Sequence, residues 1–320
     1  MLHVRNLKMY YEVGSSYVRA IDGVSFSLGK AETLGIVGES GCGKSSLAAT
    51  LLKLLPSNAR ILDGEIIFNG IDLVKLPEER MRKEIRWKNI SIIFQGSMSA
   101  LNPVMKVGDQ IAEAILAHEG GVTKREALER ATEILGLVGL DKSVAKRYPF
   151  ELSGGQRQRA MIAMALVLRP KIVVADEPTT ALDVIVQAQV LKLLESLREK
   201  LGLSLILISH DISVVSEISD RVAVMYAGKI VELGPAESVL LKPAHPYTRL
   251  LIEAVPSVKG ARKTLKHIPG QPPDLSNPPP GCRFHPRCPY ATDECRSREP
   301  ELVEVEKGHY VACHLAGGAG

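Results

Sequence analysis

The sequence is poor in aromatic residues and has no long hydrophobic run. Phe, Trp and Tyr make up 4% of its 320 residues, and no apolar run approaches the ~20 residues that a membrane-spanning helix needs. The longest apolar run, 161–168, is predicted to be one buried helix. The first residues also lack the basic-then-apolar layout of a secretion signal. We therefore expect a chain that stays in the cytoplasm and reaches a membrane only through partners.

Neither sign of charge dominates. The sequence has 40 Lys and Arg residues and 36 Asp and Glu residues, which gives a net charge of +4. Because nucleic-acid binding usually requires a pronounced basic face, we expect no nucleic-acid partner. The hydrophobic fraction of 45% is ordinary for a globular protein, and the length suits one large domain or two modest ones.

The pattern along residues 1–235 alternates between β and α signals, which predicts an α/β fold with a mostly parallel sheet flanked by helices. The apolar runs 33–37 and 171–175 are typical of central strands buried on both faces, and 203–208 is similar. Between about 96 and 149 the pattern becomes helical, so we expect a helical insertion there. Apolar residues recur at helical spacing over 124–137, which predicts a helix within that insertion.

After residue 241 the composition of the sequence changes. The stretch 256–280 holds seven prolines in 25 residues, too many for a helix or a central strand. We expect an extended linker there, leading into a small cysteine-bearing module at 281–314.

A glycine-rich loop follows the predicted strand 33–37. Its sequence, GESGCGKS, fits G-x-x-x-x-G-K-[ST] and runs into a predicted helix at 46–55. Glycines let backbone amides turn inward as an anion-binding nest, and the helix N-terminus adds the positive end of its dipole. Lys44 is expected to reach the β- and γ-phosphates of a nucleotide, and the Ser45 hydroxyl to ligate Mg²⁺. The nucleotide contacts predicted for the loop are Gly38, Ser40, Gly41, Cys42, Gly43, Lys44, Ser45 and Ser46.

Asp176 and Glu177 follow the apolar residues 172–175. A buried strand there delivers both carboxylates to the edge where open α/β sheets place ligands. An acidic pair after a strand is usually a helix N-cap. Beside a phosphate loop, however, we expect Asp176 to hold Mg²⁺ through water and Glu177 to polarise the attacking water.

A second glycine pair lies in LSGGQ at 152–156, ahead of a predicted helix at 157–168. Ser-Gly-Gly at this place caps a helix or lets backbone amides approach a phosphate closely. One chain has no need of two phosphate cradles for one nucleotide. We therefore expect this segment to complete the site of a partner subunit, through Ser153, Gly154, Gly155 and Gln156.

With these three motifs in this order, the sequence resembles the ATP-binding cassette (ABC) superfamily over about residues 1–240. The resemblance implies an ABC ATPase nucleotide-binding domain, with a RecA-like core, an antiparallel β subdomain and a helical subdomain at about 96–154. It also implies ATP as the substrate and a dimer that traps ATP between the phosphate loop of one subunit and the LSGGQ segment of the other.

The same resemblance implies further site residues. Tyr11 is similar to the aromatic residue that stacks on adenine, although Tyr10 is equally eligible. Gln95 is similar to the glutamine that contacts Mg²⁺ and water, and Asp183 to an aspartate that contacts the other subunit. His210 is similar to the histidine at the γ-phosphate, where it would share charge stabilisation with Lys44 and Mg²⁺.

Three features resemble the oligopeptide/dipeptide importer ATPases: the segment 97–103, the run from His245 to Thr248, and the extension 241–314. We therefore predict a C-terminal domain at 241–320, a peripheral location at the cytoplasmic face of the cell membrane, and import of peptides. The expected partners are a second ATPase subunit, either a paralogue or a copy of this chain, two transmembrane permease subunits and, indirectly, an extracellular substrate-binding protein.

Other functions remain open to different degrees. The same ATPase role in an importer of a nickel chelate or an oligosaccharide is the main alternative. ABC ATPases of DNA repair place a long coiled coil between the two nucleotide motifs, and those of translation carry two cassettes. This sequence has no heptad run between Lys44 and Asp176, and it has one phosphate loop.

Four of the five cysteines fall within 32 residues, with the spacing C-x5-C-x6-C-x17-C: Cys282, Cys288, Cys295 and Cys313. Disulfides are disfavoured in the cytoplasm, so a metal site is the leading interpretation. The paired C-x2-C of most zinc modules is missing, and the resemblance implies a [4Fe-4S] cluster. Structural zinc and free or redox-paired thiols stay open, and His285 and His314 are near enough to compete as ligands.

Overall fold

The computed structural model describes residues 1–96, 100–254 and 268–316. Residues 97–99 of the predicted 97–103 segment and residues 256–267 of the predicted linker 256–280 therefore lie outside the described residues. The chain forms two compact units. Unit 1 comprises Met1–Leu28, Thr33–Lys75 and Ile208–Gly320, and unit 2 comprises Gly29–Glu32 and Leu76–Leu207. The predicted domain boundary after residue 240 stays a prediction.

Unit 1 contains an antiparallel sheet of four strands in the order β2-β1-β4-β5. Leu2 in β1 lies opposite Leu28 of β2 and Phe68 of β4, so apolar side chains meet on one face. The register shifts between Val4 and Leu7, which is a β-bulge. This sheet confirms the antiparallel β subdomain. Its strands are β1 (Leu2–Val13), β2 (Ser16–Leu28), β4 (Ala59–Phe68) and β5 (Ile71–Asp72).

The second sheet region of unit 1 contains the strand that carries the phosphate loop. Strand β3 (Thr33–Val37) is buried along its whole length, which confirms the prediction for 33–37, and it pairs in parallel with β9 (Arg221–Tyr226). The antiparallel strands β10 (Lys229–Pro235), β12 (His309–Val311) and β11 (Val303–Glu306) continue from β9. The C-terminal region therefore extends a sheet that begins beside the loop.

Helices and short turns complete unit 1. They are α1 (Lys44–Leu51), α7 (Ile212–Ile218), α8 (Ala236–Leu241), α9 (Pro246–Glu253), the 3₁₀ turn η5 (His285–Arg287) and α10 (Asp293–Ser297). An aromatic cluster joins β9 to the C-terminal region. The ring of Tyr226 lies 4.6 Å from that of Tyr247 and 5.1 Å from that of Phe284, and all three side chains are buried.

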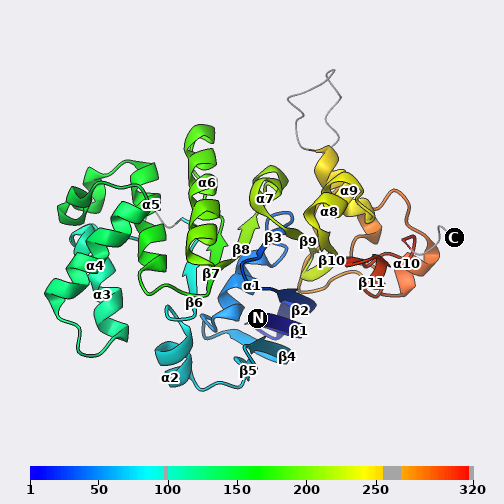
Figure 1. The fold of residues 1–320 in the computed structure, drawn as a ribbon. Coiled ribbons are helices and arrows are strands. Elements are labelled where there is room, and N and C mark those ends of the chain that lie inside the picture. The colour runs from blue at the N-terminus through cyan, green and yellow to red at the C-terminus, as the bar shows by residue number, and fades with distance from the viewer. Residues whose placement is uncertain (97–99, 255–267, 317–320) are drawn as a thin grey trace. The chain divides into compact units, whose positions relative to one another are not determined.

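Unit 2 is mainly helical around the parallel pair β6 (Ile90–Ile93) and β7 (Ile172–Asp176). Helices α3, α4 and α5 lie side by side (Figure 1). The remaining elements are α2 (Glu78–Arg80), η1 (Met81–Ile85), α3 (Val107–His118), α4 (Lys124–Leu137), η3 (Lys142–Lys146), η4 (Pro149–Glu151), α5 (Gly154–Leu166) and α6 (Val184–Leu201).

The helix predicted at 124–137 is α4, and it begins where Thr123 and Glu126 form a reciprocal capping box. Helix α5 ends at Leu166, so the prediction that 161–168 is one buried helix is wrong for its last two residues. Strand β8 (Ser204–Ser209) contains the point where the two units divide.

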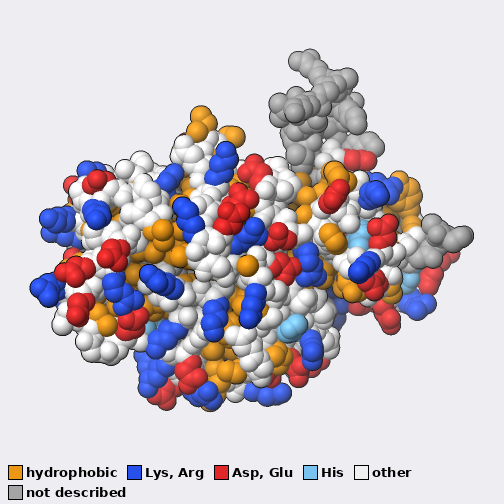
Figure 2. Space-filling model, viewed as in Figure 1, with side chains coloured by type: hydrophobic (Ala, Val, Ile, Leu, Met, Phe, Trp, Pro, Cys, Tyr) orange, Lys and Arg blue, Asp and Glu red, His pale blue; other side chains and the backbone are white. Residues whose placement is uncertain are grey.

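Among the helices of the described residues, none has the length and hydrophobicity needed to cross a membrane. Over the face seen in Figure 2, Lys and Arg side chains are interspersed with Asp and Glu side chains.

Candidate functional site

The phosphate loop runs from Gly38 to Gly43, between the end of β3 and the start of α1. Gly43 has φ 107°, a conformation that residues with a side chain rarely adopt. A Cβ atom on Gly43 would lie 2.1 Å from the Ala20 carbonyl oxygen, and one on Gly38 would lie 2.1 Å from the Met225 carbonyl oxygen. The loop therefore takes this path only because glycine stands at both positions.

Lys44 is buried, and its Nζ atom donates to the carbonyl oxygens of Gly38 at 2.6 Å and Glu39 at 3.0 Å. The ammonium group is thus held inside the curl of the loop. Helix α1 starts here with Gly43 as its N-cap and without an acidic side chain in its first turn. A positive side chain and a helix N-terminus at one place suit a phosphate group.

Two neighbouring tyrosines of β1 have different surroundings. The Tyr11 hydroxyl lies 3.0 Å from Ser46 Oγ in the first turn of α1. The Tyr10 hydroxyl instead donates to Asp22 Oδ1 at 2.7 Å, and burial together with this bond raises the pKa of Tyr10 to about 12. The Tyr11 hydroxyl is therefore directed to the helix that follows the phosphate loop, and stacking of Tyr11 on adenine stays a prediction.

In unit 2, the structure brings Gln95 and Glu177 together although 82 residues separate them. Gln95 Nε2 donates to Glu177 Oε2 at 2.8 Å, and Thr180 Oγ1 donates to the same oxygen at 2.9 Å. Asp176 is the buried last residue of β7, and Glu177 has φ 47°. A left-handed non-glycine residue carries backbone strain, which concentrates at functional sites.

The LSGGQ segment forms the start of α5. Ser153 Oγ accepts from the Gln156 backbone N–H at 3.3 Å, and Gln156 Oε1 accepts from the Ser153 N–H at 3.0 Å. These two bonds form a capping box, so the motif caps helix α5, which is one of the two roles expected from its sequence. Gly155 has a packing reason as well, because a Cβ atom there would lie 2.8 Å from Val186 Cγ1. Contacts of Ser153 and Gly154 with a partner's nucleotide stay a prediction.

Asp183 is also a helix N-cap, because its Oδ1 accepts from the Val186 N–H at 2.9 Å. The next two side chains, Val184 and Ile185, are 81% and 72% exposed. His210 is exposed directly after β8. The phosphate loop and His210 thus belong to unit 1, whereas Gln95, Asp176, Glu177, Ser153 and Asp183 belong to unit 2.

All four C-terminal cysteines line one small cavity in unit 1, together with Phe284 and His245: Cys282, Cys288, Cys295 and Cys313. Burial, followed by the neighbouring thiols, raises the pKa of Cys282 to about 11. The cysteines form no disulfide. Within residues 1–96, 100–254 and 268–316, no three His, Cys, Asp or Glu side chains are arranged to hold one metal ion. The predicted metal site, whether an iron–sulfur cluster or zinc, therefore finds no support among the described residues.

The two histidines expected to compete for a metal are engaged elsewhere. His285 Nδ1 lies 3.0 Å from the Cys282 carbonyl oxygen, and His314 Nε2 lies 2.9 Å from the Arg298 carbonyl oxygen. Both histidines also line the cavity, so it is bordered by imidazole rings as well as by the four thiols.

Two residues that were not among the predicted site residues join the C-terminal region to the phosphate loop. The Tyr247 hydroxyl accepts from the Glu39 backbone N–H at 2.9 Å, and Arg287 forms an ion pair with the Glu39 carboxylate at 2.6 Å. Tyr247 lies in the segment from His245 to Thr248 that resembles peptide importers, which was the one available signal.

Comparison with known proteins gives two family matches and a set of full-length relatives. Residues 21–180 match the ABC transporter family, and residues 231–295 match the oligopeptide/dipeptide transporter C-terminal region. The chain is 48% identical to the probable peptide ABC transporter ATP-binding protein y4tR of Sinorhizobium fredii, over 98% of this chain and 94% of the relative. It is 46% identical to the oligopeptide transport ATP-binding protein OppD of Escherichia coli, over 98% of this chain and 92% of the relative.

Among solved structures, the chain is similar to the ATP-binding cassette MJ0796, described as a dimer in a post-hydrolysis state bound to ADP and Pi. The TM-score is 0.66 at 29% sequence identity, and the match covers 74% of this chain and 99% of that one. The likeness confirms the cassette fold.

Proposed function

Because this chain belongs to the ABC transporter family, we propose that it is the ATP-binding and ATP-hydrolysing subunit of an importer of oligopeptides or dipeptides. One observation carries the substrate class. The similarity to peptide-importer subunits extends through the C-terminal region matched at residues 231–295, beyond the cassette that ABC transporters share. We propose that the chain works at the cytoplasmic face of a cell membrane as a peripheral subunit.

The phosphate loop is the proposed ATP cradle. When ATP binds, Lys44 exchanges its bonds to the Gly38 and Glu39 carbonyl oxygens for the phosphate oxygens. The predicted Mg²⁺ donors Ser45, Gln95 and Asp176 all supply oxygen, the donor that this hard cation prefers. Bound Mg²⁺ supplies charge neutralisation at the phosphates. His210 is the proposed contact to the γ-phosphate.

Glu177 is the proposed residue that positions the attacking water. Gln95 and Thr180 both donate to its Oε2 atom, which orients the carboxylate before any substrate arrives. A preoriented carboxylate needs no rearrangement during the reaction, and this contributes to the rate.

We propose that two ATPase subunits, either two copies of this chain or this chain and a paralogue, enclose ATP between them. Ser153 to Gln156 and Asp183 would then reach the nucleotide or the partner across the interface. The dimeric cassette to which this chain is similar supports the arrangement. Exposed apolar side chains at Val184 and Ile185 suit a surface that a partner covers. Two permease subunits and a substrate-binding protein complete the proposed transporter.

For the cysteine module we propose a [4Fe-4S] cluster. Four thiols around one cavity fit its donor set, because each thiolate binds a different iron. A tetrahedral zinc ion, with Zn–S distances of about 2.3 Å, requires its sulfurs about 3.8 Å apart. Zinc is therefore the alternative occupant that the metal analysis distinguishes from the cluster. Analysis of iron, sulfide and zinc in protein purified without oxygen tests this proposal directly.

The function is tested by reconstituting the chain with its permease and ATPase partners in lipid vesicles and measuring ATP hydrolysis with and without peptide-loaded binding protein. Peptides are expected to stimulate hydrolysis. In the matched Glu177→Gln variant, ATP binding should persist while hydrolysis falls by about 10²–10⁴-fold, the usual contribution of general-base catalysis. Stimulation by a nickel chelate or an oligosaccharide, but not by peptides, would overturn the substrate class and leave the ATPase intact.

A further inference from the structure

The C-terminal region holds one residue of the phosphate loop from two sides. Arg287 donates through Nη1 and Nη2 to the two carboxylate oxygens of Glu39, at 2.6 Å and 3.0 Å. The Tyr247 hydroxyl accepts from the backbone N–H of the same residue at 2.9 Å. Glu39 is the second residue of the loop, and its carbonyl oxygen accepts from Lys44. The position of Glu39 therefore also sets where the lysine ammonium rests.

Arg287 is itself fixed in place. Its guanidinium is buried, Nε donates to the Pro269 carbonyl oxygen at 2.6 Å, and Nη1 also donates to the Tyr226 hydroxyl at 3.2 Å. The guanidinium also lies 5.7 Å from the centre of the Tyr226 ring, which packs on Tyr247. A fork with this many partners behaves as a rigid support, because a bidentate pair constrains direction as well as distance.

The turn that carries Arg287 is flanked by two of the four cysteines. Turn η5 lies between Cys282 and Cys288, and Arg287 immediately precedes Cys288. The His285 N–H donates to the Cys282 carbonyl oxygen at 2.9 Å, and the Cys288 N–H donates to the His285 carbonyl oxygen at 3.3 Å. Whatever holds the two thiols in place therefore also holds the guanidinium.

We propose that Arg287 and Tyr247 are positioning residues for ATP binding, and that through Arg287 the integrity of the cysteine module controls the affinity for ATP. Without Arg287, the Glu39 carboxylate would stand uncompensated beside the incoming phosphates, and like charges at short range repel. The loop would also lose its support on the side of the C-terminal region. The positioning role stands on the contacts alone, whereas the coupling to the module rests on the proposed ligand role of the cysteines.

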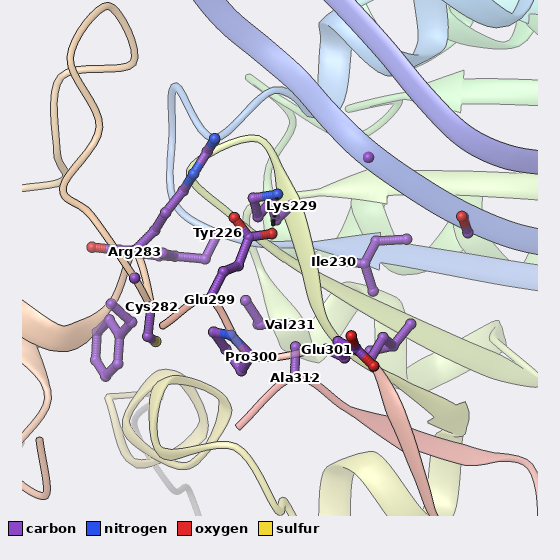
Figure 3. A pocket seen from close by; sticks show the side chains of 15 residues that line it. Tyr226, Lys229, Ile230, Val231, Cys282, Arg283, Glu299, Pro300, Glu301 and Ala312 are labelled. Atoms are coloured by element: carbon purple, nitrogen blue, oxygen red, sulfur yellow. Dashed lines mark hydrogen bonds and ion pairs between the residues drawn. The ribbon is translucent and has the colours of Figure 1, made fainter. Parts of the chain in front are cut away.

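The chain offers a matched control. Arg283 belongs to the same turn region and is as buried as Arg287, with exposed fractions of 7% and 6%. It pairs with Asp22 of β2 and donates to the Ala227 carbonyl oxygen, so its polar partners lie in the core of unit 1 and not in the phosphate loop. Figure 3 shows Arg283 beside Tyr226 and next to Cys282.

The experiment compares Arg287→Met with Arg283→Met in the full chain, using equilibrium binding of a fluorescent ATP analogue and thermal unfolding. We expect both variants to lose stability, but only Arg287→Met to lose affinity for ATP, by about tenfold. The double variant Arg287→Met/Glu39→Gln should regain part of this loss, because the uncompensated carboxylate is gone. Wild-type affinity in Arg287→Met, or an equal loss in Arg283→Met, would overturn the positioning role.

A second comparison tests the coupling. Cys288→Ser should lower the iron content and weaken ATP binding in the wild-type background, yet add no further loss of affinity in the Arg287→Met background. Loss of iron with unchanged ATP affinity would overturn the coupling. If the wild-type chain contains no iron, the proposed cluster fails, and the comparison of Arg287→Met with Arg283→Met still decides the positioning role.

Discussion

A loop position can require glycine because its φ is positive or because a Cβ atom would clash with a neighbour. Three glycines of the phosphate loop allow these two causes to be tested separately. Gly41 has φ 79° with no atom within 4 Å of an added Cβ, so only its backbone conformation demands glycine. Gly38 lacks a positive φ, but its added Cβ would lie 2.1 Å from the Met225 carbonyl oxygen. Gly43 combines both features, with φ 107° and an added Cβ at 2.1 Å from the Ala20 carbonyl oxygen. Alanine at each position therefore tests one cause or both.

The magnitudes follow from these geometries. Alanine in the left-handed region costs about 1–2 kcal/mol, which is the loss of stability expected for Gly41→Ala. Overpacking costs about 1–3 kcal/mol, and the contact at Gly38 is with rigid backbone, so Gly38→Ala should fall at the upper end of that range. If the two costs add, Gly43→Ala should lose about 2–5 kcal/mol.

Urea unfolding of the full chain measures these losses, and repeating it with saturating ATP measures binding. ATP at 100 times its dissociation constant stabilises a folded protein by about 2.7 kcal/mol. Gly38→Ala and Gly43→Ala should lose most of this increment, because either clash displaces the loop from its neighbouring strand. The reasoning is refuted if Gly41→Ala destabilises the chain as much as Gly43→Ala, since backbone conformation alone would then account for the glycines.

Two further predictions concern stability away from the loop. Asp22→Asn should cost about 3–5 kcal/mol at pH 7 by urea unfolding, because it leaves the buried Arg283 without its carboxylate. Burial raises the pKa of Asp22, but the Tyr10 hydrogen bond and the charges of Lys229 and Arg283 outweigh it and hold that pKa below its usual 3.8. This stabilisation is full above about pH 4 and is lost as the pH falls further, so the difference between Asp22→Asn and wild type should shrink in acid. Thr123→Ala removes the capping box of α4 and should cost about 1 kcal/mol without changing ATP binding; a loss of binding would contradict a purely local role.

Local patterns predicted the elements that local forces determine. The apolar run 33–37 is β3 without any shift, and 124–137 is α4, because an apolar run marks the first element in the sequence and apolar residues at helical spacing mark the second. Strand β7 starts and ends one residue later than the predicted strand 171–175. Helix α1 begins earlier than predicted, and it also ends earlier because Lys53 adopts φ 51° and the chain turns there. Such ends depend on tertiary contacts that spacing does not contain.

The candidate site likewise contains residues that the sequence identifies and residues that only the fold brings to it. Motif spacing identifies the phosphate loop because its chemistry needs consecutive residues, whereas the support of Glu39 comes from Arg287, 248 residues away. In the sequence, Arg283 and Arg287 stand four residues apart between two cysteines and look equivalent. The η5 turn sends one guanidinium to Asp22 and the other to Glu39. Since only the fold distinguishes them, a difference in ATP affinity between their variants would show that this turn, rather than the composition of the module, connects it to the nucleotide.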